Sequence, residues 1–223
     1  EFVARADSPQ DVGASSFEDE LAVFGITEEE VIEEGVNVPS FSARGAKSEQ
    51  QSQEFIEATV EARERGWMDG LEGGLSLPDN NLNLPEGAQG TFKPGVRNFT
   101  GEKIRNTDNR KAQININPDS VEEWDGEEKY VPFGPDEASK MEYAVSHEFG
   151  HSQHYNNLIE ERGATVEEIE SDEFQRELQD DMREHKDAIE EEFSALAANN
   201  PFEFAADTFS ALAVGADVSD EVL

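Results

Sequence analysis

Residues 140–157 read KMEYAVSHEFGHSQHYNN, and they contain the pattern H-E-x-x-H at His147, Glu148 and His151. Residues four apart lie on the same face of a helix, so both imidazoles can point at one ion. Neutral imidazole is a good zinc ligand, and Glu148 projects toward the open side of such a site. The pattern therefore predicts a zinc-binding helix on which Glu148 takes a proton from a water that the metal activates.

The flanking residues favour a helix at this position. Met141, Val145 and Phe149 recur every four residues and form an apolar stripe. Asp136 places an acid near the expected start, where the helix dipole favours negative charge, and Gly163 is a suitable terminator. The alternative is a helix whose histidines are only packed or solvated, but the agreement of stripe, acid and glycine favours the metal site.

A third protein ligand is expected downstream, because a catalytic zinc site has three protein ligands and one open position. Residues 200–207 read NPFEFAAD, in which Asn200 is a suitable N-cap and Pro201 a suitable first helical residue. Glu203 and Asp207 are four apart and share a face, so one carboxylate can bind the metal while the other hydrogen-bonds to a ligand histidine. Considered without H-E-x-x-H, they would be interpreted as two solvated acids in a very acidic chain.

Together, H-E-F-G-H and the later P-F-E-F-A-A-D-T-F resemble the gluzincin metallopeptidases over residues 85–215. The most similar motif is N-P-x-E-F-F-A-E-x-F. It is typical of the branch that includes anthrax lethal factor, the Pro-Pro endopeptidases and zincin-like domains of phage head-morphogenesis proteins. The resemblance implies zinc ligation by His147, His151 and Glu203, a general base at Glu148, and the second acid of the motif at Asp207.

One position departs from the family pattern and leaves the oxyanion stabiliser open. Lethal factor and the Pro-Pro endopeptidases carry a tyrosine upstream of the ligand glutamate, for transition-state stabilisation, and Leu196 occupies that position here. His185 and Tyr155 are candidates for the role, with His154 as a further rival. For His185 the default interpretation is a solvated or packed side chain. The expectation of enzymatic activity therefore leaves the identity of the oxyanion stabiliser open.

A strand is predicted shortly before the metal helix. Residues 111–117, KAQININ, alternate polar and apolar side chains. Zincins place a sheet edge beside the metal helix, so the resemblance implies an edge strand here. A polypeptide substrate could add to it through main-chain hydrogen bonds, and a plain core strand is the alternative. The residues expected to form this substrate edge are Gln113, Ile114, Asn115 and Ile116.

The chain is strongly acidic, with 17 Lys and Arg against 52 Asp and Glu and a net charge of −35. Its 14 Phe and 2 Trp, together with amphipathic segments, argue against disorder. Dispersed acids with scarce lysine suit folding in molar salt, where repulsion is screened, and indicate a halophilic archaeon or its virus. Direct nucleic-acid binding is disfavoured because no basic stripe exists. No apolar run approaches the ~18 residues of a membrane span, and the lack of cysteine excludes thiolate metal sites.

The predicted fold class is α+β and zincin-like, with a small mixed sheet, an active-site helix and a following helical subdomain. We expect residues 1–84 to form an acidic helical N-terminal region and linker, with its best helix at 48–65 and a Gly-rich loop at 70–90. Residues 85–223 are expected to form a zincin-like metallopeptidase domain. Within it, residues 165–198 are expected to form a long acidic helix with one break near Ser171.

The expected function is hydrolysis of peptide bonds by a zinc-dependent endopeptidase. The phage members of the family suggest a role in virus head maturation, with capsid or portal proteins as partners and the virion or the cytoplasm of a halophilic host as location. The alternative is a structural or assembly component of a haloarchaeal virus particle whose zincin site is vestigial. Since the first residue is Glu1 rather than Met, a processed product or fragment is expected, and secretion stays open.

Overall fold

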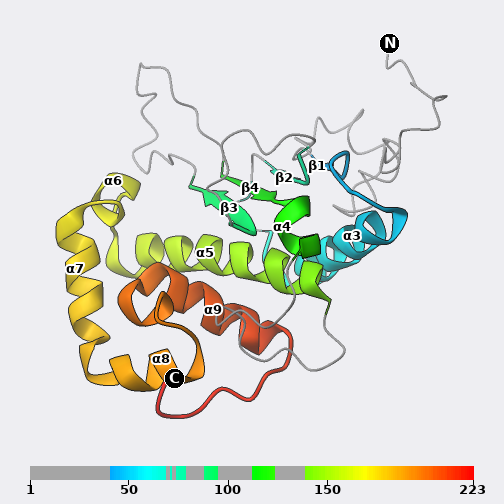
Figure 1. Ribbon diagram of the computed structural model, residues 1–223. Coiled ribbons are helices and arrows are strands. Elements are labelled where there is room, and N and C mark those ends of the chain that lie inside the picture. Colours follow the sequence, from blue (N-terminus) through cyan, green and yellow to red (C-terminus); the bar gives the residue numbers. More distant parts are fainter. Residues whose placement is uncertain (1–40, 69–70, 72–73, 79–87, 95–111, 124–138) are drawn as a thin grey trace, which may run out of the picture.

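The computed structural model describes residues 41–68, 71, 74–78, 88–94, 112–123 and 139–223. Within these ranges, the structure contains helices α3 to α9 and a four-stranded mixed sheet, with α3 and α5 on one side of the sheet (Figure 1). The expected combination of helices with a small mixed sheet is confirmed. Of the expected N-terminal region 1–84, the structure describes residues 41–68, 71 and 74–78. They contain the helix expected at 48–65 and also two short strands, while residues 1–40 lie outside the described residues.

The sheet has the strand order β1-β2-β4-β3. The strands are β1 (Phe41–Ser42), β2 (Gly74–Ser76), β3 (Gly90–Lys93) and β4 (Gln113–Ile116). β1, β2 and β4 are parallel to their neighbours, while β3 pairs antiparallel with β4. β2 falls inside the Gly-rich segment that was expected to be a loop.

The expectation that Gln113, Ile114, Asn115 and Ile116 form an edge strand is wrong. β4 pairs with β2 on one side and with β3 on the other, so both of its backbone edges are already hydrogen-bonded. The alternation of its side chains arises because one face lies on the core, where Ile114 and Ile116 are fully buried. Alternation reports which face is buried and not which strands are neighbours. Among the described strands, β3 is the edge beside β4.

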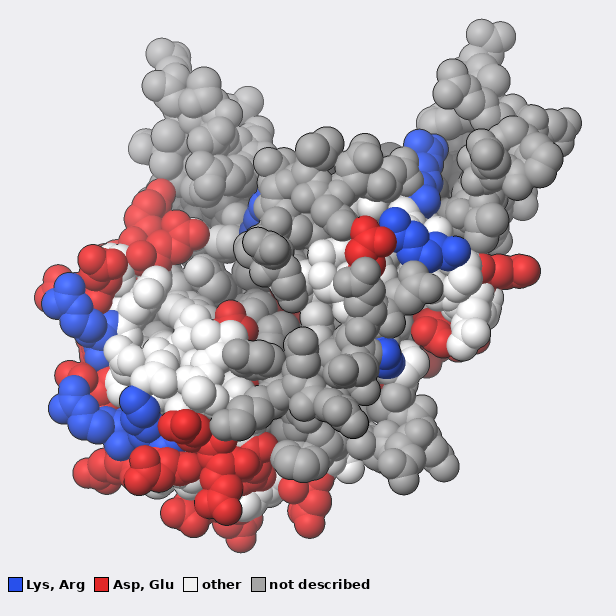
Figure 2. Space-filling view, in the orientation of Figure 1, with Lys and Arg blue, Asp and Glu red and all other residues white. Residues whose placement is uncertain are grey.

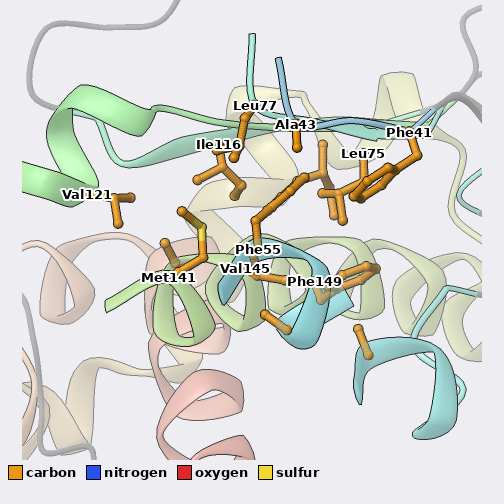
Figure 3. Close-up of a cluster of buried hydrophobic side chains, with 14 of the residues drawn as sticks. Phe41, Ala43, Phe55, Leu75, Leu77, Ile116, Val121, Met141, Val145 and Phe149 are labelled. Carbon is orange, nitrogen blue, oxygen red and sulfur yellow. The ribbon is translucent and has the colours of Figure 1, made fainter. Parts of the chain in front are cut away.

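The main core lies between the sheet and two helices, α3 (Glu49–Glu64) and α5 (Lys140–Arg162) (Figures 1 and 3). Leu75 and Ile116 from the sheet pack with Phe55 of α3 and Phe149 of α5, and all four are fully buried. This core joins residues from both sides of the boundary expected between 84 and 85. The described residues on either side of this boundary therefore share one hydrophobic core.

Helix α5 carries both histidines, and its ends are set by local sequence. Ser139 is the N-cap, whose hydroxyl accepts a hydrogen bond from the backbone N–H of Glu142. Gly163 is the C-cap and has φ = 65°, in the left-handed region that favours glycine, as predicted. The helix begins at Lys140, so Asp136 precedes it and lies outside the described residues.

The segment expected to be one long acidic helix is divided into several short ones. These are α6 (Val166–Ile169), α7 (Asp172–Asp181), the 3-10 turn η1 (Arg183–His185), α8 (Lys186–Glu192) and the 3-10 turn η2 (Ala197–Asn199). The break at Ser171 is confirmed, because its hydroxyl caps α7 by accepting from Phe174 N–H. Two further breaks, at Met182 and Phe193, were not predicted. They let the chain turn around Leu178 and Ile189, which anchor two small cores of their own.

The C-terminal helix α9 (Pro201–Ala213) runs beside α5, on the side away from the sheet (Figure 1). Asn200 caps it by accepting from the backbone N–H groups of Phe202 and Glu203, and Pro201 is its first residue, as predicted. In the described part of the chain, no helix combines the length and apolarity needed to span a membrane.

Acidic side chains gather on the lower left of the molecule, over the helices that follow α5, beside some Lys and Arg and an uncharged area (Figure 2). Only Leu178 of α7 is buried, and the acids of this helix are exposed. Like charges at this density repel one another, and salt screens that repulsion over a Debye length of about 3 Å at 1 M and about 8 Å at 0.15 M. Added salt would therefore weaken the repulsion among these acidic side chains.

We expect the midpoint of thermal unfolding to fall when KCl is reduced from about 3 M to about 0.15 M, because the screening of the acidic surface is lost. The double substitution Glu190→Gln and Glu191→Gln, at two exposed positions of α8, should reduce this dependence. Thermal melts monitored by circular dichroism across a KCl series measure both effects. A midpoint that is independent of KCl would contradict the interpretation.

Candidate metal centre

Three potential ligands from two helices converge at one point. His147 and His151 come from the middle of α5, and Glu203 comes from the first turn of α9. One ligand atom from each of the three lies within 4.8 Å of the others. Nε2 of His147 is 3.4 Å from Glu203 Oε2, and Nε2 of His151 is 3.8 Å from Glu203 Oε1. Two imidazole nitrogens and one carboxylate oxygen form a donor set that suits zinc, and the cluster is able to hold a metal ion.

A close crossing of the two helices makes this convergence possible. A Cβ atom added at Gly150 would lie 2.7 Å from the Cα of Ala206, closer than real Cβ contacts. Hydrogen at Gly150 and a methyl group at Ala206 therefore let the backbones approach each other between the ligands. Ser210 fixes the crossing further along, where its hydroxyl donates to the backbone oxygen of Tyr143 at 3.1 Å.

Asp207 orients one of the two histidines. Its Oδ1 lies 2.9 Å from Nδ1 of His147, and its side chain is 7 % exposed. A carboxylate on Nδ1 holds the proton there and leaves Nε2 free to act as a ligand, which is the usual outer-shell arrangement of a metal-binding histidine. The structure thus brings Asp207 to the place where the motif predicts it.

The charges around His147 favour a cation. Burial alone would lower the pKa of His147, but its hydrogen bonds with Asp207 and Glu203 prevail and raise it to about 10. Burial and the neighbouring His147 charge lower the pKa of His151 to about 3, so this imidazole is neutral and can donate a lone pair. The carboxylates of Asp207 and Glu203 thus place negative charge around His147, and the same negative charge would also favour binding of a divalent cation.

Glu148 lies beside the cluster with an unused acceptor. Its side chain is buried, and Oε2 has no hydrogen-bond partner among the described residues. Burial raises the pKa of Glu148 to about 7. A buried carboxyl with a pKa near neutrality is suited to accepting and returning a proton.

The edge strand packs directly on Glu148. A Cβ atom at Gly90 would lie 2.7 Å from Glu148 Oε1, so glycine at the first position of β3 lets its backbone touch the carboxylate. Asn117 fixes the two residues that precede this strand. Its backbone N–H donates to Gln89 O at 2.7 Å, and its side-chain amide donates to Ala88 O at 3.0 Å. The sheet edge and the candidate base are therefore neighbours.

The candidates for an oxyanion stabiliser lie in different places. Tyr155 follows His151 by one turn of α5 and packs between Phe92 and Phe202, with ring centroids at 5.5 and 5.4 Å. His154 packs edge-on against Phe202 and stays outside the ligand cluster. His185 is exposed in η1, and the structure does not bring it to the cluster.

Leu196, at the position of the family tyrosine, is 47 % exposed and offers no hydrogen-bond donor from its side chain.

Three residues of the site were missed by the sequence analysis. Gly150 stands inside H-E-x-x-H, and Tyr143 precedes His147 by four residues on the same helix face, so both carried a positional signal. No sequence signal pointed to Gly90, because its contact with Glu148 depends on the position of β3 relative to α5.

Comparisons with protein-family models, with curated proteins and with solved structures found no match for this chain.

Proposed function

We propose that the protein is a zinc-dependent endopeptidase of the gluzincin type. The observation that carries the proposal is the cluster of His147, His151 and Glu203, with the buried Glu148 beside it and Asp207 behind His147. The three ligands match the number and type found in catalytic zinc sites, which keep one position open. The unpartnered oxygen of Glu148 supplies the acceptor that hydrolysis requires.

The roles of the side chains follow from their positions. His147, His151 and Glu203 would hold the metal, and Asp207 keeps the proton of His147 on Nδ1. A bound zinc ion would polarise the scissile carbonyl and lower the pKa of a coordinated water. Glu148 accepts the proton of the attacking water and then donates it to the leaving amine, so the carboxylate is regenerated at the end of the cycle.

The position of β3 supports a polypeptide substrate. This strand pairs with β4 on one side only among the described residues, and its first residue touches Glu148. An extended peptide that added to its outer edge would gain main-chain hydrogen bonds and would pass next to the metal cluster. The substrate strand is therefore proposed at Gly90–Lys93 instead of at residues 113–116.

The acidic surface supports a high-salt setting, and we extend the proposal to a protein of a halophilic host. A role in virus head maturation, partners in a virion, and a virion location stay predictions from the family resemblance.

The experiment is a metal and peptidase assay of the purified chain in molar KCl. We expect about one zinc per chain by elemental analysis, and cleavage of a peptide library that a chelator abolishes and added zinc restores. Mass spectrometry of the library identifies the cleaved bonds. A zinc-loaded chain that cleaves no peptide would contradict the peptidase, and a chain that binds no zinc would contradict the metal centre itself.

A further inference from the structure

Tyr143 stands one turn before His147 on the helix face that carries both histidines. Its side chain is buried, with 4 % of the residue exposed. The hydroxyl donates to Oδ1 of Asp207 at 3.4 Å, and the same oxygen lies 2.9 Å from Nδ1 of His147. A continuous chain of polar contacts therefore runs from Tyr143 through Asp207 to the imidazole whose Nε2 faces Glu203.

Both ends of Tyr143 are attached to α9. The hydroxyl contacts Asp207, and the backbone oxygen accepts a hydrogen bond from Ser210, which is fully buried three residues further along the same helix. Burial and the charge of Asp207 raise the pKa of Tyr143 well above its usual range, so the phenol keeps its proton and acts as a donor. The carboxylate of Asp207 is thus held from two sides, by a phenol and by an imidazole.

We propose that Tyr143 is a positioning residue of the metal centre, which fixes the Asp207 carboxylate so that it orients His147 toward the metal. An aspartate side chain can rotate about its last bond, and one contact to His147 leaves that rotation partly free. The second contact selects one orientation of the carboxylate and thereby one orientation of the ring. The inference rests on the metal centre of the proposed function and does not depend on the hydrolytic step.

The test compares the metal affinity of Tyr143→Phe with that of the parent protein. Phenylalanine keeps the ring and removes the hydroxyl. We expect zinc to bind about 3- to 20-fold more weakly. Loss of a residue that hydrogen-bonds directly to a metal ligand lowers metal affinity about 10- to 100-fold, and Tyr143 is one hydrogen bond further from the metal than such a residue. Competition with a chromogenic chelator in molar KCl measures the affinity, and the visible absorption bands of the cobalt-loaded protein should shift with the altered ligand geometry.

Tyr155→Phe is the matched control. It makes the same substitution on the same face of α5, one turn after His151, where the ring packs against Phe92 and Phe202 instead of bonding to Asp207. Its zinc affinity and cobalt spectrum should equal those of the parent. A merely structural effect of removing a buried phenol would lower the thermal midpoint of the metal-free protein and leave both metal readouts unchanged.

A double-substitution cycle tests whether Tyr143 acts through Asp207. Asp207→Asn should weaken zinc binding by itself, and adding Tyr143→Phe to it should weaken binding no further. Additive losses, or an unchanged affinity and spectrum in Tyr143→Phe, would overturn the inference. A parent protein that binds zinc but cleaves no peptide would count against the proposed peptidase alone.

Discussion

Replacing Glu148 with glutamine will leave zinc binding intact and will reduce peptide hydrolysis by about 10²- to 10⁴-fold. Glutamine has nearly the same shape as glutamate, so it fits the buried space beside Gly90 without displacing the strand. It cannot accept a proton from water, and general-base catalysis contributes a factor of this size. The ligands His147, His151 and Glu203 are unchanged, so the zinc content should be that of the parent.

The measurement pairs initial rates of peptide cleavage with elemental analysis of the same samples. Glu160→Gln serves as the control, because it makes the identical substitution at an exposed position of α5. Cleavage by Glu148→Gln at the parent rate, with a normal zinc content, would show that another group accepts the proton.

The second large effect is expected from Gly150→Ala. The new methyl group would lie 2.7 Å from the Cα and 3.0 Å from the carbonyl oxygen of Ala206, and 3.0 Å from the Cβ of Phe209. Two of these atoms belong to the backbone of α9, so no side-chain rotation relieves the overlap. The helix must shift away from α5, and Glu203 and Asp207 on either side of Ala206 will move with it.

For Gly150→Ala we expect the free energy of unfolding to fall by about 1–3 kcal/mol, which is the usual cost of adding a methyl group to a well-packed core. This loss occurs although alanine is preferred over glycine within helices by about 1 kcal/mol. Zinc affinity should fall about 10- to 100-fold, because a ligand and the partner of a ligand are both displaced. Denaturant unfolding in molar KCl and chelator competition measure the two losses.

Asn157→Ala is the control for this substitution, since it also places alanine on α5 but at an exposed position. If Gly150→Ala were as stable as the parent and bound zinc as tightly, the close crossing would not be what sets the geometry of the cluster.

Local features of the sequence predicted the elements that carry the site. The four-residue spacing of His147 and His151 and the cap at Asn200 depend only on neighbouring residues, and the structure shows α5 and α9 where they indicated. The spacing of Glu203 and Asp207 likewise predicted that both carboxylates face the histidines, and the structure brings them there.

The arrangement of the strands could not be derived in this way. The alternation in β4 gave its buried face correctly and its place in the sheet incorrectly, because strand order depends on segments far apart in the sequence. β2 has only three residues and begins at Gly74, whose φ of 101° is typical of a turn, so its composition indicated a loop. The division of residues 165–198 depends on the small cores around Leu178 and Ile189, which are also tertiary features.

The position of Glu203 in the sequence has a consequence for synthesis of the protein. Helix α5 leaves the ribosome well before α9, so a nascent chain first presents His147 and His151 without the Glu203 carboxylate. The third donor arrives only after the helices between them have been made and α9 has docked against Gly150. Under the proposed function, tight metal binding would therefore begin only after α9 has been made, and a chain that lacks α9 would have neither the complete cluster nor the proposed activity.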